Sequence, residues 1–278
     1  MPRYAICNET FGDMPLPAAL ALTRQYGYTG WEVAPFMLGK LTSDAPWTAH
    51  FGPRQREAYR NEVESAGLSI VGIHWLLAHT TGFHLTTGDT SVRRATADHM
   101  DDLIDLCADL GGQVMVLGSP GQRNLTEGQS MEQAMERAAD VLKHSLPKLH
   151  ERNVRIALEP LGPSEGNFLN TADDAVHLAG LVDDPAVALH LDVKAMSTES
   201  DPIEQVIRKH ADQMIHFHAN DPNLLGPGMG DVDFQPIMAA LAEVGYDEWI
   251  SVEVFDYTPG VETILRSSME TLQTHSAT

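Results

Sequence analysis

Short apolar runs rich in β-branched residues alternate with longer amphipathic stretches along the whole chain, and this alternation constrains the fold more than any other feature. The strand-like runs cover residues 4–7, 30–34, 68–74, 114–117, 154–159, 187–192, 214–218 and 249–253. The helical stretches that follow them cover residues 17–26, 54–66, 92–110, 131–151, 171–181, 203–212, 234–244 and 261–272. Connections of this length are too long for hairpins and are typical of helices that join parallel strands.

Eight strand–helix units in 278 residues predict an α/β fold of the (β/α)8 TIM barrel type. We expect a single domain, residues 1–278, because no linker rich in Pro, Gly or Ser divides the chain. Glycine or asparagine follows five of the helical stretches, as is common where helices end: Gly27, Gly67, Gly111, Asn153 and Gly245. The alternative is an open doubly wound sheet, but no glycine-rich dinucleotide fingerprint follows the first strand.

Charge and composition restrict the partners of the protein. The net charge of −21 repels the phosphates of nucleic acids and anionic membranes. No apolar run reaches the ~18 residues that span a bilayer, and the N-terminus lacks the pattern of a secretory signal. Cys7 and Cys107 lie in apolar contexts that predict buried, reduced thiols. We therefore expect a cytoplasmic protein that binds neither nucleic acid nor a membrane.

Four potential metal ligands stand at the ends of the last four strand-like runs. They are Glu159, Asp192, His218 and Glu253, spaced 33, 26 and 35 residues apart. A single carboxylate at such a position is usually a helix cap or a solvated group. In a barrel, however, the carboxyl ends of all strands meet at one face, where barrel enzymes place their sites. Three carboxylates and one imidazole at that face predict a site for a hard divalent cation.

Further polar residues are expected near this face. His190 and His216 each lie two residues before a predicted ligand, so they share its side of the strand at a deeper level, where a hydrogen-bonded core histidine is the commoner outcome. His74 and Trp75 end the third strand and could bind substrate hydroxyls and form a stacking wall, or could be core residues. Glu32 on the second strand fits either the barrel interior or a structural ion pair.

Two loops on the same face offer additional candidates. Gln122 and Arg123 follow the fourth strand and could hydrogen-bond to a sugar or an acid, although a charge on a surface loop is an equally good reading. The loop of residues 220–230 after the seventh strand is rich in turn formers and contains no Lys or Arg. It therefore fits a plain loop near the substrate as well as a phosphate-binding loop.

The strand ends also carry a family resemblance. Four segments resemble the metal-site strands of the sugar phosphate isomerase/epimerase superfamily: residues 157–161 (ALEPL), 189–194 (LHLDVK), 216–221 (HFHAND) and 251–254 (SVEV). These xylose isomerase-like barrels include ketose 3-epimerases, hydroxypyruvate isomerase, inosose isomerase and dehydratase, and endonuclease IV. The likeness covers essentially the whole chain and is strongest after residue 150.

The resemblance implies a ligand set and a chemistry. A divalent metal, manganese first and magnesium or cobalt as alternatives, would be held by Glu159, Asp192, His218 and Glu253. The two glutamates would also exchange protons with the substrate from opposite faces of one carbon. Asp221 resembles the acidic partner that orients the metal-binding histidine. The resemblance further implies a homo-oligomer, a dimer or a tetramer, and a small sugar as the substrate.

This chain departs from the ketose 3-epimerase pattern at two substrate-binding positions. Ala195 stands where those enzymes carry a histidine, and Leu224 stands where they carry an arginine. Lys194 could replace part of the missing contacts by donating to a substrate oxygen, or it could be a surface lysine. The substrate is therefore bound differently, and its identity stays open.

These observations leave several functional hypotheses. The first is a metal-dependent isomerase or epimerase of a sugar, keto-sugar or cyclitol, which removes a proton beside a carbonyl and passes through an enediolate. The second is a lyase or deglycosidase that uses the same proton abstraction to eliminate a group from a 3-keto-glycoside. Nucleic-acid processing, suggested by endonuclease IV, is disfavoured by the net charge of −21. A non-catalytic sugar-binding role is the remaining class.

Overall fold

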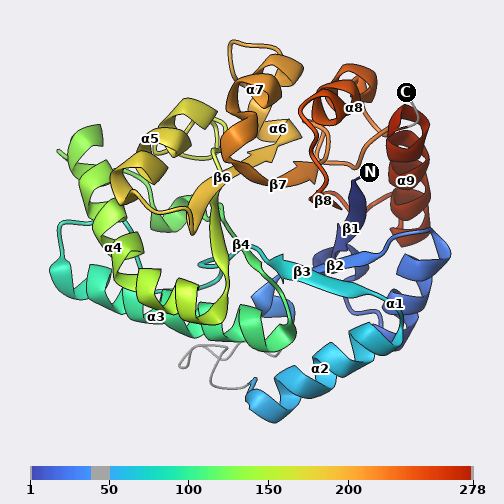
Figure 1. Cartoon of the computed structure of the whole chain (residues 1–278), viewed down its shortest axis with the longest axis horizontal. Helices are drawn as coiled ribbons and strands as arrows, with labels where there is room; N and C mark the ends of the chain where they lie inside the picture. The colour runs from blue at the N-terminus through green and yellow to red at the C-terminus, as the bar shows by residue number, and fades with distance from the viewer. Residues whose placement is uncertain (1, 39–50, 277–278) are drawn as a thin grey trace.

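The computed structural model describes residues 2–38 and 51–276 and shows a closed barrel of eight parallel strands in sequential order. The strands are β1 Arg3–Cys7, β2 Gly30–Val33, β3 Ser69–Ile73, β4 Val114–Leu117, β5 Arg155–Leu158, β6 Val187–Asp192, β7 Met214–Ala219 and β8 Trp249–Val252. The barrel closes because β1 pairs with both β2 and β8. Figure 1 shows the strands at the centre with the helices around them. The predicted TIM barrel is confirmed.

Each predicted helix is present within a few residues of its expected bounds. The helices are α1 Leu16–Gln25, α2 Pro53–Ser65, α3 Thr90–Leu110, α4 Met131–Arg152, α5 Ala172–Val182, α6 Val193–Met196, α7 Ile203–His210, α8 Phe234–Glu243 and α9 Val261–Ser276. Short 3-10 turns cover Asn8–Phe11, Pro35–Met37, Pro120–Gln122 and Ala211–Gln213. None of the helices within these described ranges is long and apolar enough to cross a membrane.

The five expected helix-ending residues all have left-handed backbones, with φ between 54° and 89°. This conformation is open to glycine, and to asparagine at small cost, and it turns the chain out of the helix. At the start of α4, the Ser130 hydroxyl accepts a hydrogen bond from the Gln133 amide at 3.2 Å. These caps determine where the helices begin and end, and therefore where the neighbouring strands begin and end.

The interior of the barrel is apolar at one end and polar at the other. Ala157 and Ala188 pack with Val116 and Ile215 in a small cluster that is separate from the main core between strands and helices. By strand alternation, Ala157 shares the side of Glu159 one layer below it, and Ala188 shares the side of Asp192 two layers below it. The layers above hold buried glutamates and histidines instead of aliphatic residues, and these form the site described below.

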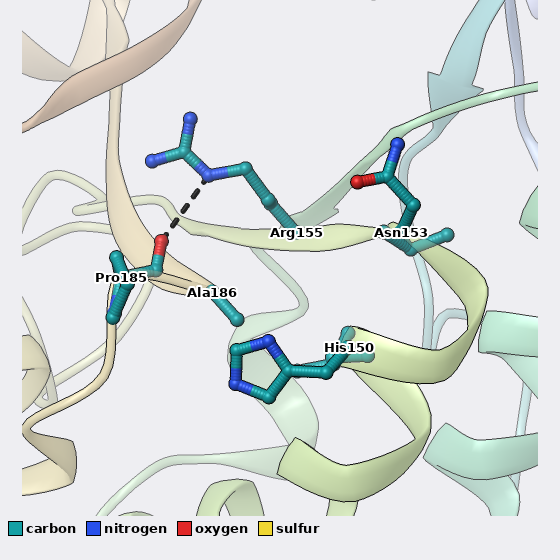
Figure 2. A pocket seen from close by; sticks show the side chains of 7 residues that line it. His150, Asn153, Arg155, Pro185 and Ala186 are labelled. Carbon is teal, nitrogen blue, oxygen red and sulfur yellow. Dashed lines mark hydrogen bonds between the residues drawn. The ribbon is translucent and has the colours of Figure 1, made fainter.

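A hollow of about 270 Å³ lies at the opposite end of the barrel, where α4 ends and β5 begins (Figure 2). His150, Asn153 and Arg155 surround it, and Nε of Arg155 donates to the carbonyl of Pro185 at 3.2 Å. This bond ties the start of β5 to the turn before β6. The amino-terminal face of a TIM barrel serves stability rather than catalysis.

The buried His99 on α3 makes stability depend on pH. Its ring stacks on Phe83 with centroids 4.3 Å apart, and burial lowers the pKa of His99 to about 4. Between pH 6.5 and pH 4 the unfolded chain binds a proton at His99 that the native protein does not. The free energy of unfolding therefore falls by about 3 kcal/mol as the pH falls through this range. Urea unfolding at pH 7 and at pH 4 measures this. We expect the free energy of unfolding of His99→Phe to fall by about 3 kcal/mol less than that of wild type between these two pH values. Equal losses would contradict this.

Candidate metal and active site

The predicted site residues meet at the carboxyl ends of the strands around a cavity of about 290 Å³. Residues that line it include Trp75, Gly118, Glu159, Glu165, Glu253 and Phe255. Glu159 and Glu253 are the first residues after β5 and β8, so the barrel geometry brings side chains 94 positions apart in sequence into one wall. Parallel strands leave their carboxyl ends at the same face, which explains why strand-end residues converge here.

A compact group of potential metal ligands forms the deeper part of this site. Ligand atoms of Glu159, His190, Asp192 and His218 all lie within 4.8 Å of one another, and all four residues are buried. The pairing of β6 with β7 places His190 opposite His216 and Asp192 opposite His218. Three of the four predicted ligands are therefore together, and His190 joins them.

Glu253, the fourth predicted ligand, lies beside this group rather than in it. Its Oε2 is 3.2 Å from Nδ1 of His218, and its Oε1 accepts a hydrogen bond from Nε1 of Trp75 at 2.7 Å. Ligand atoms of Glu253 also lie within 4.8 Å of those of Glu9 and His74. Burial would raise the pKa of Glu253, but His218 and His74 together hold the pKa below its usual value.

Glycine at position 118 makes room for Glu159. A Cβ atom added at Gly118 would lie 1.6 Å from Oε2 of Glu159, so any side chain there would displace the carboxylate. Burial and the carboxylates of Glu253 and Asp192 raise the pKa of Glu159 to about 8. Its charged form is thus destabilised by neighbours of the same sign.

Asp192 is held by two further contacts. Its Oδ1 accepts the amide of Ala195 at 2.8 Å, which caps the short helix α6, and its Oδ2 accepts the side-chain amide of Asn220 at 2.5 Å. Burial and the charge of Glu253 raise the pKa of Asp192 to about 6. The helix α6 was not expected, because its four residues are too few for a periodic signal.

This group of residues fits a divalent cation. The pKa values of Glu159 and Asp192 are raised because burial and neighbouring carboxylates disfavour their ionised forms, and a bound cation would relieve this by neutralising the carboxylates. Among the residues that the structure describes, neither buried ring nitrogen of His190 has a hydrogen-bond partner, which provides an additional donor. Carboxylate oxygens and imidazole nitrogens are ligands that divalent metals accept.

Glu32 connects the histidines beneath the site. Its two oxygens lie 2.8 Å from Nε2 of His216 and 3.0 Å from Nε2 of His218, and Nδ1 of His74 is 3.5 Å from Oε1. Burial alone would raise the pKa of Glu32, but His216 and His218 hold it well below its usual value. Glu32 therefore points into the barrel and forms ion pairs there, so both readings of the sequence apply. His216 supports His218 indirectly, through Glu32.

Asp221 does not support His218 as predicted. Its carboxylate accepts backbone amides of Asn223 at 3.2 Å and Val232 at 3.0 Å, which shapes its own loop. The ring nitrogens of His218 face Glu32 and Glu253 instead. The carboxylates that orient this histidine thus come from β2 and from the end of β8.

His74 lies behind the cavity wall. It is fully buried and does not line the cavity, and its Nε2 is 3.1 Å from Oε2 of Glu9. Burial would lower the pKa of His74, but Glu9, with Glu32 and Glu253, raises the pKa to about 9. The expected contact of His74 with substrate stays a prediction. It forms a buried ion pair behind Trp75.

Trp75 lines the cavity as predicted for a stacking wall. Its ring stacks on that of Phe36, at a centroid distance of 5.4 Å, and on that of Phe255, at 6.0 Å. Its backbone is left-handed, with a φ of 54°, which is rare for an aromatic residue. The indole thus both faces the cavity and holds Glu253.

The loop candidates Gln122 and Arg123 do not line the cavity. Arg123 is 1% exposed and its Nη1 donates to the carbonyl of Leu117 at 3.0 Å. Burial lowers the pKa of Arg123 to about 10. The charge of Arg123 acts to lower the pKa of Glu159, against the larger effects that raise it. The carbonyl of Gln122 accepts the amide of Leu85 at 2.8 Å. Their role in substrate binding stays a prediction, whereas the reading of Arg123 as a surface charge is wrong because its side chain is buried.

Lys194 reaches the rim of the cavity. Its Nζ is 2.7 Å from Oε1 of Glu165, which lines the cavity, and lies 4.9 Å from the centre of the Phe255 ring. Sequence reasoning missed Glu165, and Glu9 as well. A signal for each was present, because Glu9 closely follows the end of β1 and Glu165 lies six residues after Glu159.

Comparisons with known proteins agree with this architecture. The family model described as xylose isomerase-like TIM barrel matches residues 20–275. Fructoselysine 3-epimerase of Shigella flexneri is 23% identical over 87% of this chain and 86% of its own length.

Two solved structures share the fold over nearly the whole chain. The 3-keto-D-glucoside 4-epimerase of E. coli has a TM-score of 0.83 and 18% identity, and the match covers 99% of this chain and 100% of that chain. The D-psicose 3-epimerase of Clostridium cellulolyticum H10 has a TM-score of 0.84 and 17% identity, and the match covers 99% of both chains. With the barrel and the strand-end residues in place, these matches show that the chain belongs to the xylose isomerase-like TIM barrel family of the sugar phosphate isomerase/epimerase superfamily.

Proposed function

We propose that the protein is a sugar epimerase or isomerase that depends on a divalent metal and acts on a carbon beside a carbonyl. The observation that carries this proposal is that two buried carboxylates, Glu159 and Glu253, line one cavity next to a compact group of metal ligands. The epimerase relatives support the reaction class. Manganese, a homo-oligomer and a cytoplasmic location stay predictions.

The residues would divide the chemistry as follows. Glu159, Asp192 and His218 would hold the cation, with Glu253 beside them, and the cation would polarise the substrate carbonyl. Glu253, kept ionised by His218 and oriented by Trp75, would remove the proton from the adjacent carbon and leave an enediolate. Glu159 would return a proton. Return to the opposite face inverts the carbon, whereas transfer to the neighbouring carbon moves the carbonyl.

A proton NMR experiment in heavy water tests this proposal. Manganese-loaded protein is incubated with ketoses, inososes and 3-keto-glucosides, and deuterium is expected at the carbon beside the carbonyl because the removed proton exchanges with solvent. The product then separates epimerisation and isomerisation from the alternative, elimination by a lyase or deglycosidase. Absence of exchange and of product with every sugar, in protein shown to contain metal, would contradict the proposal.

Lys194 would bind substrate at the rim of the cavity. We expect Lys194→Met, which keeps the chain length and removes the charge, to raise KM about tenfold and to change kcat less than about threefold, because the lost charge-assisted hydrogen bond lies away from the reacting carbon. Lys209→Met is the matched control, since Lys209 forms a 2.6 Å pair with Asp173 on the outside of the barrel. An unchanged KM for Lys194→Met would exclude Lys194 from substrate binding.

A further inference from the structure

The cavity at the carboxyl ends of the strands combines two carboxylates with a largely apolar wall. Glu159 and Glu253 are the carboxylates of the proposed function. Five further lining residues have apolar side chains and come from the segments that follow β3, β4, β5 and β8: Trp75, Ala78, Pro120, Leu161 and Phe255. Four separate parts of the barrel therefore build the wall, and a bound molecule meets apolar residues from each of them.

The polar side chains of the wall already have partners. The hydroxyl of Ser119 accepts the amide of Leu77 at 3.1 Å, and the carboxylate of Glu165 lies 2.7 Å from Nζ of Lys194. In the described part of the chain, no lysine, arginine or histidine lines the cavity. The pair of Lys194 and Glu165 has no net charge, so it can donate to a hydroxyl but does not supply the positive charge that holds a phosphate. The part of the substrate that faces the wall is therefore uncharged.

The wall suits an aromatic ring better than a row of hydroxyl groups. A free sugar carries a hydroxyl on most of its carbons, and a hydroxyl buried against apolar side chains loses its hydrogen bonds to water. The rings of Trp75 and Phe255 are nearly parallel, at 14° and a centroid distance of 6.0 Å, and both residues line the cavity. Aromatic faces stabilise a further ring by stacking and by the burial of apolar surface. An aryl group is therefore the favoured occupant.

Two exposed apolar side chains extend the wall toward solvent. Leu224 and Tyr257 are 44% and 41% exposed, and the third large apolar residue with comparable exposure in the described ranges is Met131, at the start of α4. The carbonyl of Leu224 accepts the amide of Phe255 at 2.9 Å, and Tyr257 follows Phe255 by two residues. Exposed apolar residues that gather beside a cavity are typical of a ligand-binding groove. The apolar surface thus continues from the cavity to its rim.

We propose that the substrate is an uncharged aryl glycoside of a keto-sugar, whose aromatic ring binds against Trp75, Leu161 and Phe255. The keto-bearing sugar ring then lies at Glu159 and Glu253. This inference rests on the proposed function, because it names the substrate class of the same site. The alternative is an unsubstituted sugar that places its C–H groups on the wall, and it predicts no gain from an aromatic ring.

Two glycosides that differ only in the aglycone test the proposal. Manganese-loaded full-length protein is given phenyl or methyl 3-keto-β-D-glucoside in heavy water, and kcat/KM is measured from deuterium exchange beside the carbonyl. We expect the phenyl glycoside to be preferred about 10- to 100-fold, because its ring leaves water. Phe255→Ala should reduce this ratio below about threefold, whereas the control Met131→Ala, at an exposed apolar residue on α4, should keep it. A wild-type ratio near one would overturn the proposal.

A binding measurement separates this inference from the proposed function. Phenyl and methyl β-D-glucoside lack the ketone, so their dissociation constants can be measured by NMR titration without turnover. The phenyl glycoside is expected to bind at least about tenfold more tightly to wild type and to lose this advantage in Phe255→Ala. Tighter phenyl binding without exchange in either keto-glycoside would support the aryl site and contradict the proposed function. Exchange without any preference for phenyl, in rate or in binding, would support the function and overturn the aryl site.

Discussion

Replacing either Glu159 or Glu253 with glutamine is expected to lower turnover by at least about three orders of magnitude, because an amide cannot exchange a proton with a carbon acid. Both carboxylates line the cavity, and each has a different environment: Glu159 lies against Gly118 and Glu253 accepts a hydrogen bond from Trp75. The measurement is kcat for the epimerised sugar, with metal content determined in the same samples.

Glu165→Gln is the matched control, since this glutamate also lines the cavity but pairs with Lys194 at its rim. We expect its kcat to fall far less than that of the other two variants. If Glu159→Gln and Glu253→Gln both retain bound metal and near-full activity, neither carboxylate is a base. Loss of metal from Glu159→Gln with retention in Glu253→Gln would match the four-residue group that contains Glu159 but not Glu253.

Replacing Glu32 with leucine is expected to lower the free energy of unfolding by about 3–5 kcal/mol, because it leaves buried imidazoles without their counter-charge. Glu32 is 1% exposed and lies within 3.0 Å of ring nitrogens of both His216 and His218. Urea unfolding at pH 7 measures the change. Glu32→Gln keeps a hydrogen-bonding oxygen, so its free energy of unfolding should fall less than that of Glu32→Leu.

A surface pair provides the control for Glu32. Glu248 lies 2.7 Å from Arg3, and both side chains are about half exposed, so Glu248→Leu is expected to change stability by less than about 1 kcal/mol. If Glu32→Leu were as stable as wild type, the histidines beneath the site would be neutral and well packed without it. The ion-pair reading of Glu32 would then be wrong.

The sequence was sufficient for the barrel because local signals and barrel closure agree. Apolar runs, helical periodicity and the left-handed residues Gly111 and Asn153 each report on neighbouring residues, and eight parallel strands with helical connections have few ways to close. The same geometry placed Glu159, Asp192 and His218 together, since each stands at a strand end.

The polar contacts beneath the site could not be predicted in this way. Glu32 and His218 are 186 residues apart in sequence, and no periodicity records which of several buried carboxylates faces which imidazole. Arg123 shows the same limit, because a charged residue in a loop of glycine and proline is normally solvated, yet the fold covers it completely enough to lower its pKa to about 10.

Trp75 has a consequence for how the specificity of this enzyme can change during evolution. Its indole face forms part of the cavity wall, while its N–H group holds the carboxylate of Glu253. A substitution that enlarged the cavity at this position would also release Glu253. A change that admitted new substrates would therefore weaken catalysis at the same time. Phe255 lines the cavity, stacks on Trp75 and holds no carboxylate, so it is a position where the substrate range can change while the chemistry is preserved.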